Sequence, residues 1–160
     1  MSQLTDKVNE YLKKLNYKPT VNQNTSDILE LSGLNGSNIN GFTIQIIGKD
    51  TEKNQLSCLL ILAHFPVKIP PDKREKIQSF FNELNKDYWY TYLIIDMETG
   101  DVICAASNTS NNDDAWNENF IAPIVFLPMN RLDGLTHSIM ELIYSEKTVQ
   151  DILHKITGIK

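Results

Sequence analysis

Apolar side chains recur at helical spacing, every three or four residues, in four stretches of the chain. The first stretch predicts a helix over about Thr5–Asn16, which ends before Pro19. Pro70 and Pro71 open the second helix, because proline is tolerated in a first turn whose amides have no partner. The last two stretches predict helices near the C-terminus. The four apolar stripes are Leu4, Val8, Tyr11, Leu12 and Leu15; Ile77, Phe80, Phe81 and Leu84; Leu132, Leu135, Ile139, Leu142 and Ile143; and Val149, Ile152, Leu153 and Ile156.

The segments between the first three helices have the composition and length of β-strands. A short strand around Ile28–Leu31 is followed by a turn rich in Gly and Asn, and then by two long strands, Phe42–Ile47 and Leu56–Phe65. Trp89–Asp96 and Asp101–Ala106 form a second hairpin, whose turn ends at a glycine. Strands that come in hairpins pair antiparallel.

A polar loop from Ser107 to Asn119 is expected to interrupt the sheet. The apolar segment Phe120–Leu127 then predicts a further strand. Pro123 places that strand at an edge, because proline cannot donate a hydrogen bond to a neighbouring strand.

The order of these elements predicts an α+β fold. We expect an antiparallel β-sheet of about five to six strands in hairpins, packed by an N-terminal helix, a middle helix and C-terminal helices. A length of 160 residues is typical of one domain, so residues 1–160 are expected to form a single unit.

The long strand Leu56–Phe65 is apolar on both faces, and Trp89–Ile95 is similar. An antiparallel sheet with one face in water alternates apolar with polar residues, so the second face of these strands requires a cover. Either helices of the chain provide it, or a second subunit or client protein does. The partner-binding candidates under the second alternative are strand residues, namely Ile44, Ile46, Leu60 and Leu62.

Charge and hydropathy narrow the choice of partner. The chain has 20 acidic and 15 basic residues, and the basic ones are scattered. Binding to nucleic acid requires a concentrated basic surface, so no nucleic-acid partner is expected. Cys58–Ala63, the longest apolar run, is too short to cross a bilayer, and residues 1–7 lack the apolar segment of a secretory signal. The expectation is a cytoplasmic protein without a membrane partner.

The sequence offers no assembled catalytic site. Cys58 and Cys104 lie in strand-like segments without metal-ligand or disulfide spacing, which predicts reduced, buried thiols. Nucleophilic catalysis requires a base beside the nucleophile, and His64 is about 20 Å from Cys58 along an extended strand. Cys104 approaches His64 if their hairpins are adjacent, so a Cys–His pair stays open.

Oxygen-bearing side chains also crowd the polar loop, but their spacing matches no calcium loop, and the glycine of such a loop is missing. We therefore expect no metal, no cofactor and no catalytic residue. The side chains in question are Asn112, Asp113, Asp114, Asn117 and Glu118.

Several motifs in the second half resemble the YbjN family. They are Phe80–Asn85 with its Leu-Asn helix end, Tyr90–Asp96 with the following Asp-x-x-x-Gly hairpin, Gly100–Val102, and the passage from Phe126 onward. The resemblance covers roughly Gly41 to Ile156, and the loop from Ser107 to Asn119 is an insertion relative to the family. It implies the fold of type III secretion chaperones, and a regulator or chaperone-like binder without catalytic residues.

Two functions follow from these observations. The first is a non-catalytic protein-binding module, chaperone-like or regulatory, which binds a protein client or associates with itself as a homodimer. The second is a small-molecule-binding domain or minor enzyme with a pocket between the sheet and the helices. Convergence of His64, Tyr90 and Tyr92 in a deep apolar pocket would favour the second.

Overall fold

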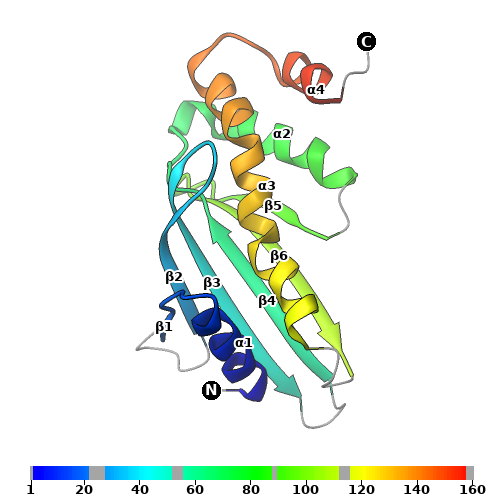
Figure 1. The fold of residues 1–160 in the computed structure, drawn as a ribbon. Helices are drawn as coiled ribbons and strands as arrows, with labels where there is room; N and C mark the ends of the chain where they lie inside the picture. Colours follow the sequence, from blue (N-terminus) through cyan, green and yellow to red (C-terminus); the bar gives the residue numbers. More distant parts are fainter. Residues whose placement is uncertain (1, 22–27, 52–55, 88–89, 112–115, 158–160) are drawn as a thin grey trace.

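The protein forms an antiparallel β-sheet with helices packed along it (Figure 1). The structure is a computed structural model that describes residues 2–21, 28–51, 56–87, 90–111 and 116–157. In chain order the elements are α1 (Gln3–Lys14), β1 (Thr20–Val21), β2 (Ile28–Asn35), β3 (Asn40–Thr51), β4 (Leu56–His64), the 3-10 helix η1 (Pro71–Lys73), α2 (Arg74–Lys86), β5 (Tyr92–Ile95), β6 (Val102–Ser110), α3 (Glu118–Tyr144) and α4 (Val149–Thr157).

The sheet confirms the predicted α+β class. Its six strands lie in the order β1-β2-β3-β4-β6-β5, and every neighbouring pair is antiparallel. Both predicted hairpins are present, and Gly100 closes the β5–β6 turn with a φ of 77°. Strand β5 is shorter than the predicted strand Trp89–Asp96, of which Trp89 lies outside the described residues. The turn that was expected after Leu31 is shorter than predicted, because β2 continues to Asn35.

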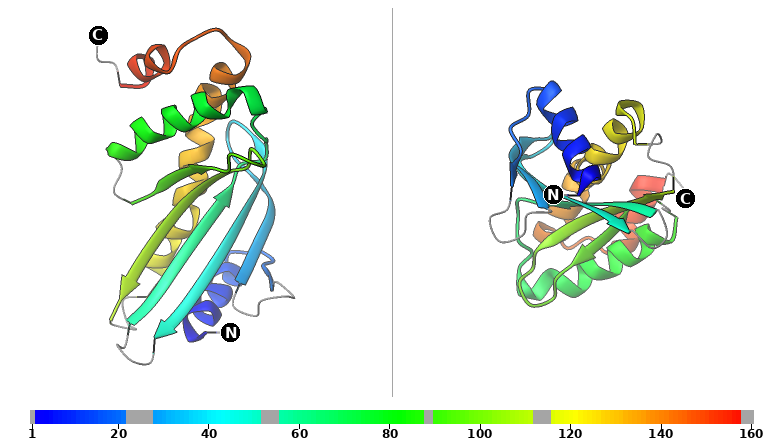
Figure 2. Two further views of the ribbon diagram at one scale, coloured as in Figure 1. Left: turned by 180° about the vertical axis from the view of Figure 1, so that it is seen from behind. Right: turned by 90° about the horizontal axis from the view of Figure 1, so that it is seen from below.

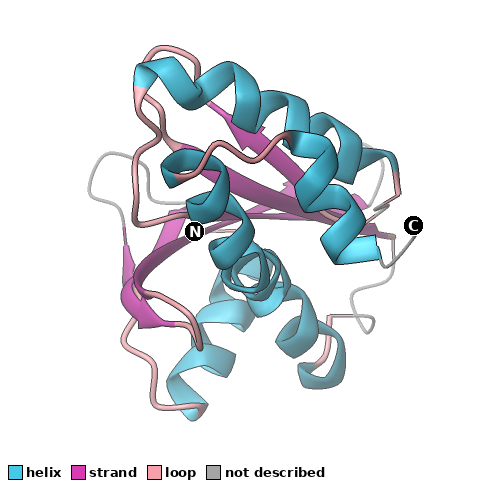
Figure 3. Ribbon diagram, turned by 90° about the horizontal axis from the view of Figure 1, so that it is seen from above, coloured by secondary structure: helices cyan, strands magenta, loops and turns pink. Residues whose placement is uncertain are grey.

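Helices α1 and α3 cover one face of the sheet (Figure 1). Fully buried side chains from β3 and β4 meet them there, including Ile44, Ile46, Leu59 and Ile61. Helix α2 packs along β5, and α2, α3 and α4 gather at the end of the molecule that Figure 3 shows from above.

The segment Phe120–Leu127 was predicted to be an edge strand, and that prediction is wrong. It forms the first turns of α3, which contains both Pro123 and Pro128. Each proline removes one i→i−4 hydrogen bond. Burial of a stripe at helical spacing offsets this loss, since Ile121, Val125 and Leu132 are at most 2% exposed.

The polar loop is also shorter than expected. Strand β6 runs on to Ser110, and Asn117 begins the helix, because its side-chain oxygen accepts a hydrogen bond from the amide of Asn119 at 3.1 Å. Residues 112–115 of the polar loop lie outside the described part of the chain.

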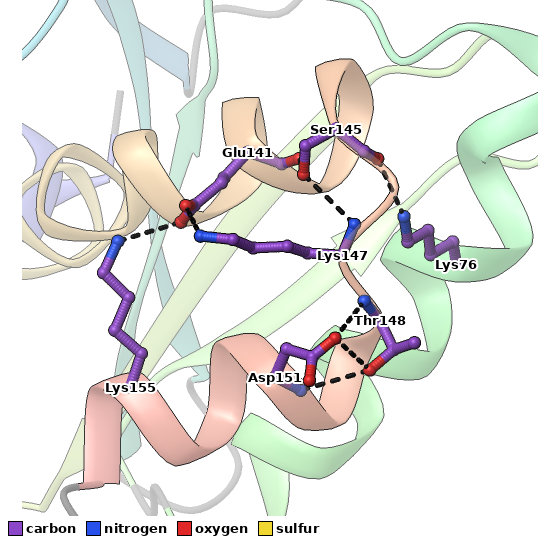
Figure 4. A network of polar contacts seen from close by, with 7 residues as sticks. All are labelled: Lys76, Glu141, Ser145, Lys147, Thr148, Asp151 and Lys155. Atoms are coloured by element: carbon purple, nitrogen blue, oxygen red, sulfur yellow. Dashed lines mark hydrogen bonds and ion pairs between the residues drawn. The ribbon is translucent and has the colours of Figure 1, made fainter.

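The link between α3 and α4 is held by polar contacts (Figure 4). Thr148 and Asp151, three residues apart in the sequence, form a capping box, in which Thr148 N donates to Asp151 Oδ2 at 2.8 Å and Asp151 N donates to Thr148 Oγ1 at 3.2 Å. Lys147 and Lys155 both donate to Glu141, and these bonds hold the pKa of the Glu141 carboxyl below its ordinary value.

A buried carboxylate ties the turn between β2 and β3 to α3. Asp133 is 8% exposed and accepts backbone hydrogen bonds from Ser37 at 2.8 Å, Asn38 at 2.9 Å and Ile39 at 3.2 Å. Asn38 Nδ2 returns a bond to the Asp133 carbonyl at 2.9 Å. Desolvation raises the pKa of the Asp133 carboxyl, but these hydrogen bonds outweigh it and hold the pKa below its ordinary value.

Replacement of this carboxylate should alter how stability depends on pH. The folded-state pKa of Asp133 is lower than the unfolded one, so its contribution is full above about pH 4 and is lost as the pH falls through the folded value. Asp133→Asn should lower the free energy of unfolding at neutral pH by about 1–3 kcal/mol. The difference from wild type should shrink as the pH falls below about 4, as followed by urea denaturation.

Asp87→Asn is the control, because Asp87 is an exposed residue at the end of α2. It should follow the wild-type profile. A constant difference between Asp133→Asn and wild type over the whole pH range would contradict the prediction.

Candidate functional site: the open face of the sheet

The register of the sheet assigns each side chain to one of two faces. Residues directly opposite one another share a face, so the pairs Ile44–Ala63 and Ile46–Ile61 place those side chains on the covered face. The intervening residues point to the other side, which we call the open face. Its apolar members are Ile28 on β2, Ile47 on β3, Leu56, Cys58, Leu60 and Leu62 on β4, Tyr92 and Ile94 on β5, and Ile103 and Ala105 on β6.

The open face is accessible to solvent. Along β4 its residues alternate strictly between half-buried and buried, and the half-buried ones belong to the open face. Tyr92 is 55% exposed and Ile94 is 42% exposed. Seen from behind, the long strands β3, β4 and β6 lie in front of α1 and α3 (Figure 2, left). The apolar side chains of this face are thus within reach of another molecule.

The four predicted partner-binding residues do not form one surface. Leu60 and Leu62 lie on the open face, but Ile44 and Ile46 lie on the covered face and are 0% exposed. Ile44 and Ile46 are therefore core residues, and their assignment to a contact surface is corrected. The face of each β3 residue follows from its β4 neighbour across the sheet, and the sequence of a single strand does not specify that pairing.

Other members of the surface were not predicted from the sequence. Ile47 and Ile103 join it from β3 and β6, while Tyr92 and Ile94 join it from β5. The alternation along β5 separates Tyr92 and Ile94 from their neighbours in the sequence. It does not indicate which side of the strand the helices cover.

A short polar row crosses the same face beside the apolar patch. Gln45 Nε2 donates to Glu30 at 3.3 Å, and Gln45 Oε1 lies 3.3 Å from His64 Nε2. Burial lowers the pKa of the His64 imidazole, and this outweighs the charges of Asp101 and Glu30, which raise it. The His64 ring thus contacts the side-chain amide of Gln45 and not a cysteine thiol.

The possible Cys–His pair is not formed. The hairpins are adjacent, as that alternative required, and His64 pairs with Ile103 while Ala63 pairs with Cys104. Neighbouring residues of a strand point to opposite faces, so the Cys104 thiol lies in the core and the His64 ring on the open face. Burial raises the pKa of Cys104 to about 11, which keeps the thiol protonated at neutral pH.

Two hollows formed by described residues are small. One of about 160 Å³ lies on the open face beside β5 and β6, where Leu60, Tyr90, Tyr92, Ala105 and Ser107 line it together with Thr91 and Ala106. It contains two of the three polar groups expected in a pocket, Tyr90 and Tyr92, but not His64. Another, of about 220 Å³, lies between α1 and the start of α3. Small-molecule sites usually enclose about 300–1,000 Å³.

Within the described ranges, no cluster of three or more His, Cys, Asp or Glu side chains is arranged to hold a metal ion. Of the loop residues with oxygen ligands, Asn117 caps α3 and Glu118 pairs with Lys14. Asn112, Asp113 and Asp114 lie outside the described part. None of the described helices is both long enough and apolar enough to span a membrane.

Comparison with known proteins gives a distant structural likeness, which carries no argument about fold or function. No model of a protein family and no curated protein matches the sequence. Among solved structures, the crystal structure of YbjN from E. coli, a candidate transcription regulator, is similar with a TM-score of 0.48 and 11% sequence identity. The match covers 82% of this chain and 92% of the YbjN chain. YbjN is the namesake of the family that the sequence resembles, but a likeness of this degree carries no argument about function.

The two thiols should differ in reactivity because they lie on different faces. Cys58 is half-buried on the open face, whereas Cys104 is 0% exposed with a pKa of about 11. Iodoacetamide at mildly alkaline pH should label Cys58 in the native protein and leave Cys104 unmodified, as measured by peptide mass spectrometry. Both should react in guanidinium chloride, which serves as the control. Labelling of native Cys104 as fast as Cys58 would contradict the assignment of faces.

Proposed function

We propose that this chain is a non-catalytic protein-binding module, chaperone-like or regulatory, that receives its partner on the open face of the sheet. The supporting observation is the row of apolar side chains on that face, which includes Leu60, Leu62 and Ile103 at its centre. Contiguous apolar surface on a folded protein is typical of an interaction site.

The composition of the face favours a protein as the partner. Tyr90 and Tyr92 stand at its β5 end with 76% and 55% of their surface exposed. Tyrosine is enriched in protein interfaces, because it combines a large apolar ring with a hydroxyl group. The apolar residues at the centre of the face carry no charge, so this part of the face does not attract the phosphates of a nucleic acid.

The geometry gives less support to a small-molecule site or an enzyme. The hollow that Tyr90 and Tyr92 share is about 160 Å³, too small for most ligands, and it is shallow because it lies on the surface of the sheet. The Cys104 thiol and the His64 ring lie on opposite faces, so these two groups do not act on one substrate.

A charge at the centre of the open face should weaken partner binding without unfolding the protein. Leu60→Asp places a carboxylate on a face in contact with water, so the fold should persist. Self-association is the first case to measure, by sedimentation of the purified protein at micromolar concentration. If wild type is a homodimer, Leu60→Asp should raise the dissociation constant at least about tenfold.

If wild type sediments as a single chain, the partner is another protein. In that case a protein captured by the wild type should be purified, and its affinity should be measured for the Leu60→Asp variant and for a control variant. Leu127→Asp is the matched control, because Leu127 is 38% exposed on α3, in the helical layer on the other side of the sheet. Equal affinity of Leu60→Asp and Leu127→Asp for the partner would overturn the proposal.

A further inference from the structure

The chain closes one edge of its sheet with a side chain. Strand β5 is an edge strand, and the amide group of Asn85 on α2 bonds both backbone groups of its Leu93. Asn85 Nδ2 donates to the Leu93 carbonyl and Leu93 N donates to Asn85 Oδ1, each at 2.9 Å. An unpaired strand edge is a template for another chain, so this contact removes that possibility at Leu93.

The neighbouring strand keeps part of its edge open. Strand β6 pairs with β4 from Ile103 to Ser110, but β5 covers only Val102 to Ala105 on its other side. Residues Ala106 to Ser110 therefore have a strand on one side alone within the described chain. This stretch of five residues continues the line of β5 beyond the point where β5 begins.

The direction of each backbone group follows from the register. The Val102 carbonyl accepts a hydrogen bond from Phe65 N at 2.9 Å, and the Asp101 carbonyl accepts one from Asp96 N at 2.9 Å. Even-numbered residues of β6 thus turn toward β4 and odd-numbered ones toward β5. Ser107 and Thr109 consequently point their N–H and C=O groups away from β4, where no described strand pairs with them.

A hollow adjoins the beginning of this free edge on the open face. Its lining includes Leu60, Tyr92 and Ala105. Ser107 also lines it, just beyond the beginning of β5. The side chain of any residue placed opposite Ser107 would share the open face with it, since Ser107 pairs with Leu60 there. The volume of about 160 Å³ suits one apolar side chain rather than a whole ligand.

We propose that the edge of β6 from Ala106 to Ser110 binds an extended peptide segment of the protein partner, which adds an antiparallel strand in line with β5. Ser107 and Thr109 exchange backbone hydrogen bonds with this segment, and an apolar side chain opposite Ser107 enters the hollow beside Leu60 and Tyr92. The inference rests on the proposed protein-binding function and specifies the form of the partner.

The residues of this stretch of β6 are suited to this role. Natural proteins protect exposed strand edges with lysine, proline or a covering element. Ala106–Ser110 has the sequence Ala-Ser-Asn-Thr-Ser, without a charge or a proline. Main-chain hydrogen bonds then provide affinity, and the hollow selects the side chain.

The experiment uses peptides from a library of random seven-residue linear sequences displayed on phage, selected on the full chain. The selected peptide is synthesised and titrated against wild type, Thr109→Pro and Ser79→Ala by calorimetry. Thr109→Pro removes one outward N–H that no described strand pairs with, so β6 should still pair with β4 and the melting temperature should be close to that of wild type. Ser79→Ala is the control, since Ser79 is exposed on α2, away from the edge of β6 and from the hollow.

We expect Thr109→Pro to abolish measurable binding of the peptide, and Ser79→Ala to bind as wild type. The amide protons of Ser107 and Thr109 should exchange rapidly with solvent in the free protein and become protected in the complex. These amide measurements on wild type also apply if Thr109→Pro fails to fold. Protection of both amides in the free protein would overturn the inference.

Failure of this inference is distinct from failure of the proposed function. If the peptide binds Thr109→Pro normally but does not bind Leu60→Asp, the open face is the binding site and the edge of β6 is not. Failure to select any peptide would overturn the inference in the same way. A homodimer that Thr109→Pro dissociates would show that the edge receives a second copy of the chain instead of a peptide.

Discussion

The antiparallel register of β3, β4 and β6 decides the surroundings of nearly every side chain in this sheet. Successive residues of a strand point to opposite sides, and α1 and α3 cover one side only. Leu59 and Ile61 are therefore core residues with 0% exposure, while Leu60 and Leu62 between and beside them are accessible. A shift of one residue in this pairing would exchange the two sets, so the same constraint fixes both the core and the candidate site.

The ends and edges of the elements are controlled by single polar side chains. Asp133 ties the β2–β3 turn to α3, and Asn85 satisfies the backbone of β5 at Leu93. Each contact joins a helix to the sheet or to one of its turns. Both satisfy backbone groups that would otherwise require water. Among the described residues, the backbone groups of Ser107 and Thr109 that face away from β4 have no such side-chain partner.

Helix α3 illustrates how packing overrides local preference. Its first turns contain Pro123, and residues Phe120–Leu127 have the composition of a strand. A strand there would have to pair with the sheet, whereas a helix buries Ile121 and Val125 against it at 2% and 0% exposure. The loss of one hydrogen bond at each proline is small beside the burial of this stripe.

The sequence by itself determined most of the strands, both hairpins, most helices and the capping box at Thr148, because each depends on neighbours within a few residues. It also determined that β4 is apolar on both sides. Only the tertiary structure decided which side the helices cover, and so separated Ile44 and Ile46 from Leu60 and Leu62 and kept Cys104 from His64. Those outcomes depend on which strands pair and in what register, and such contacts join residues far apart in the chain, where no local pattern specifies the partner.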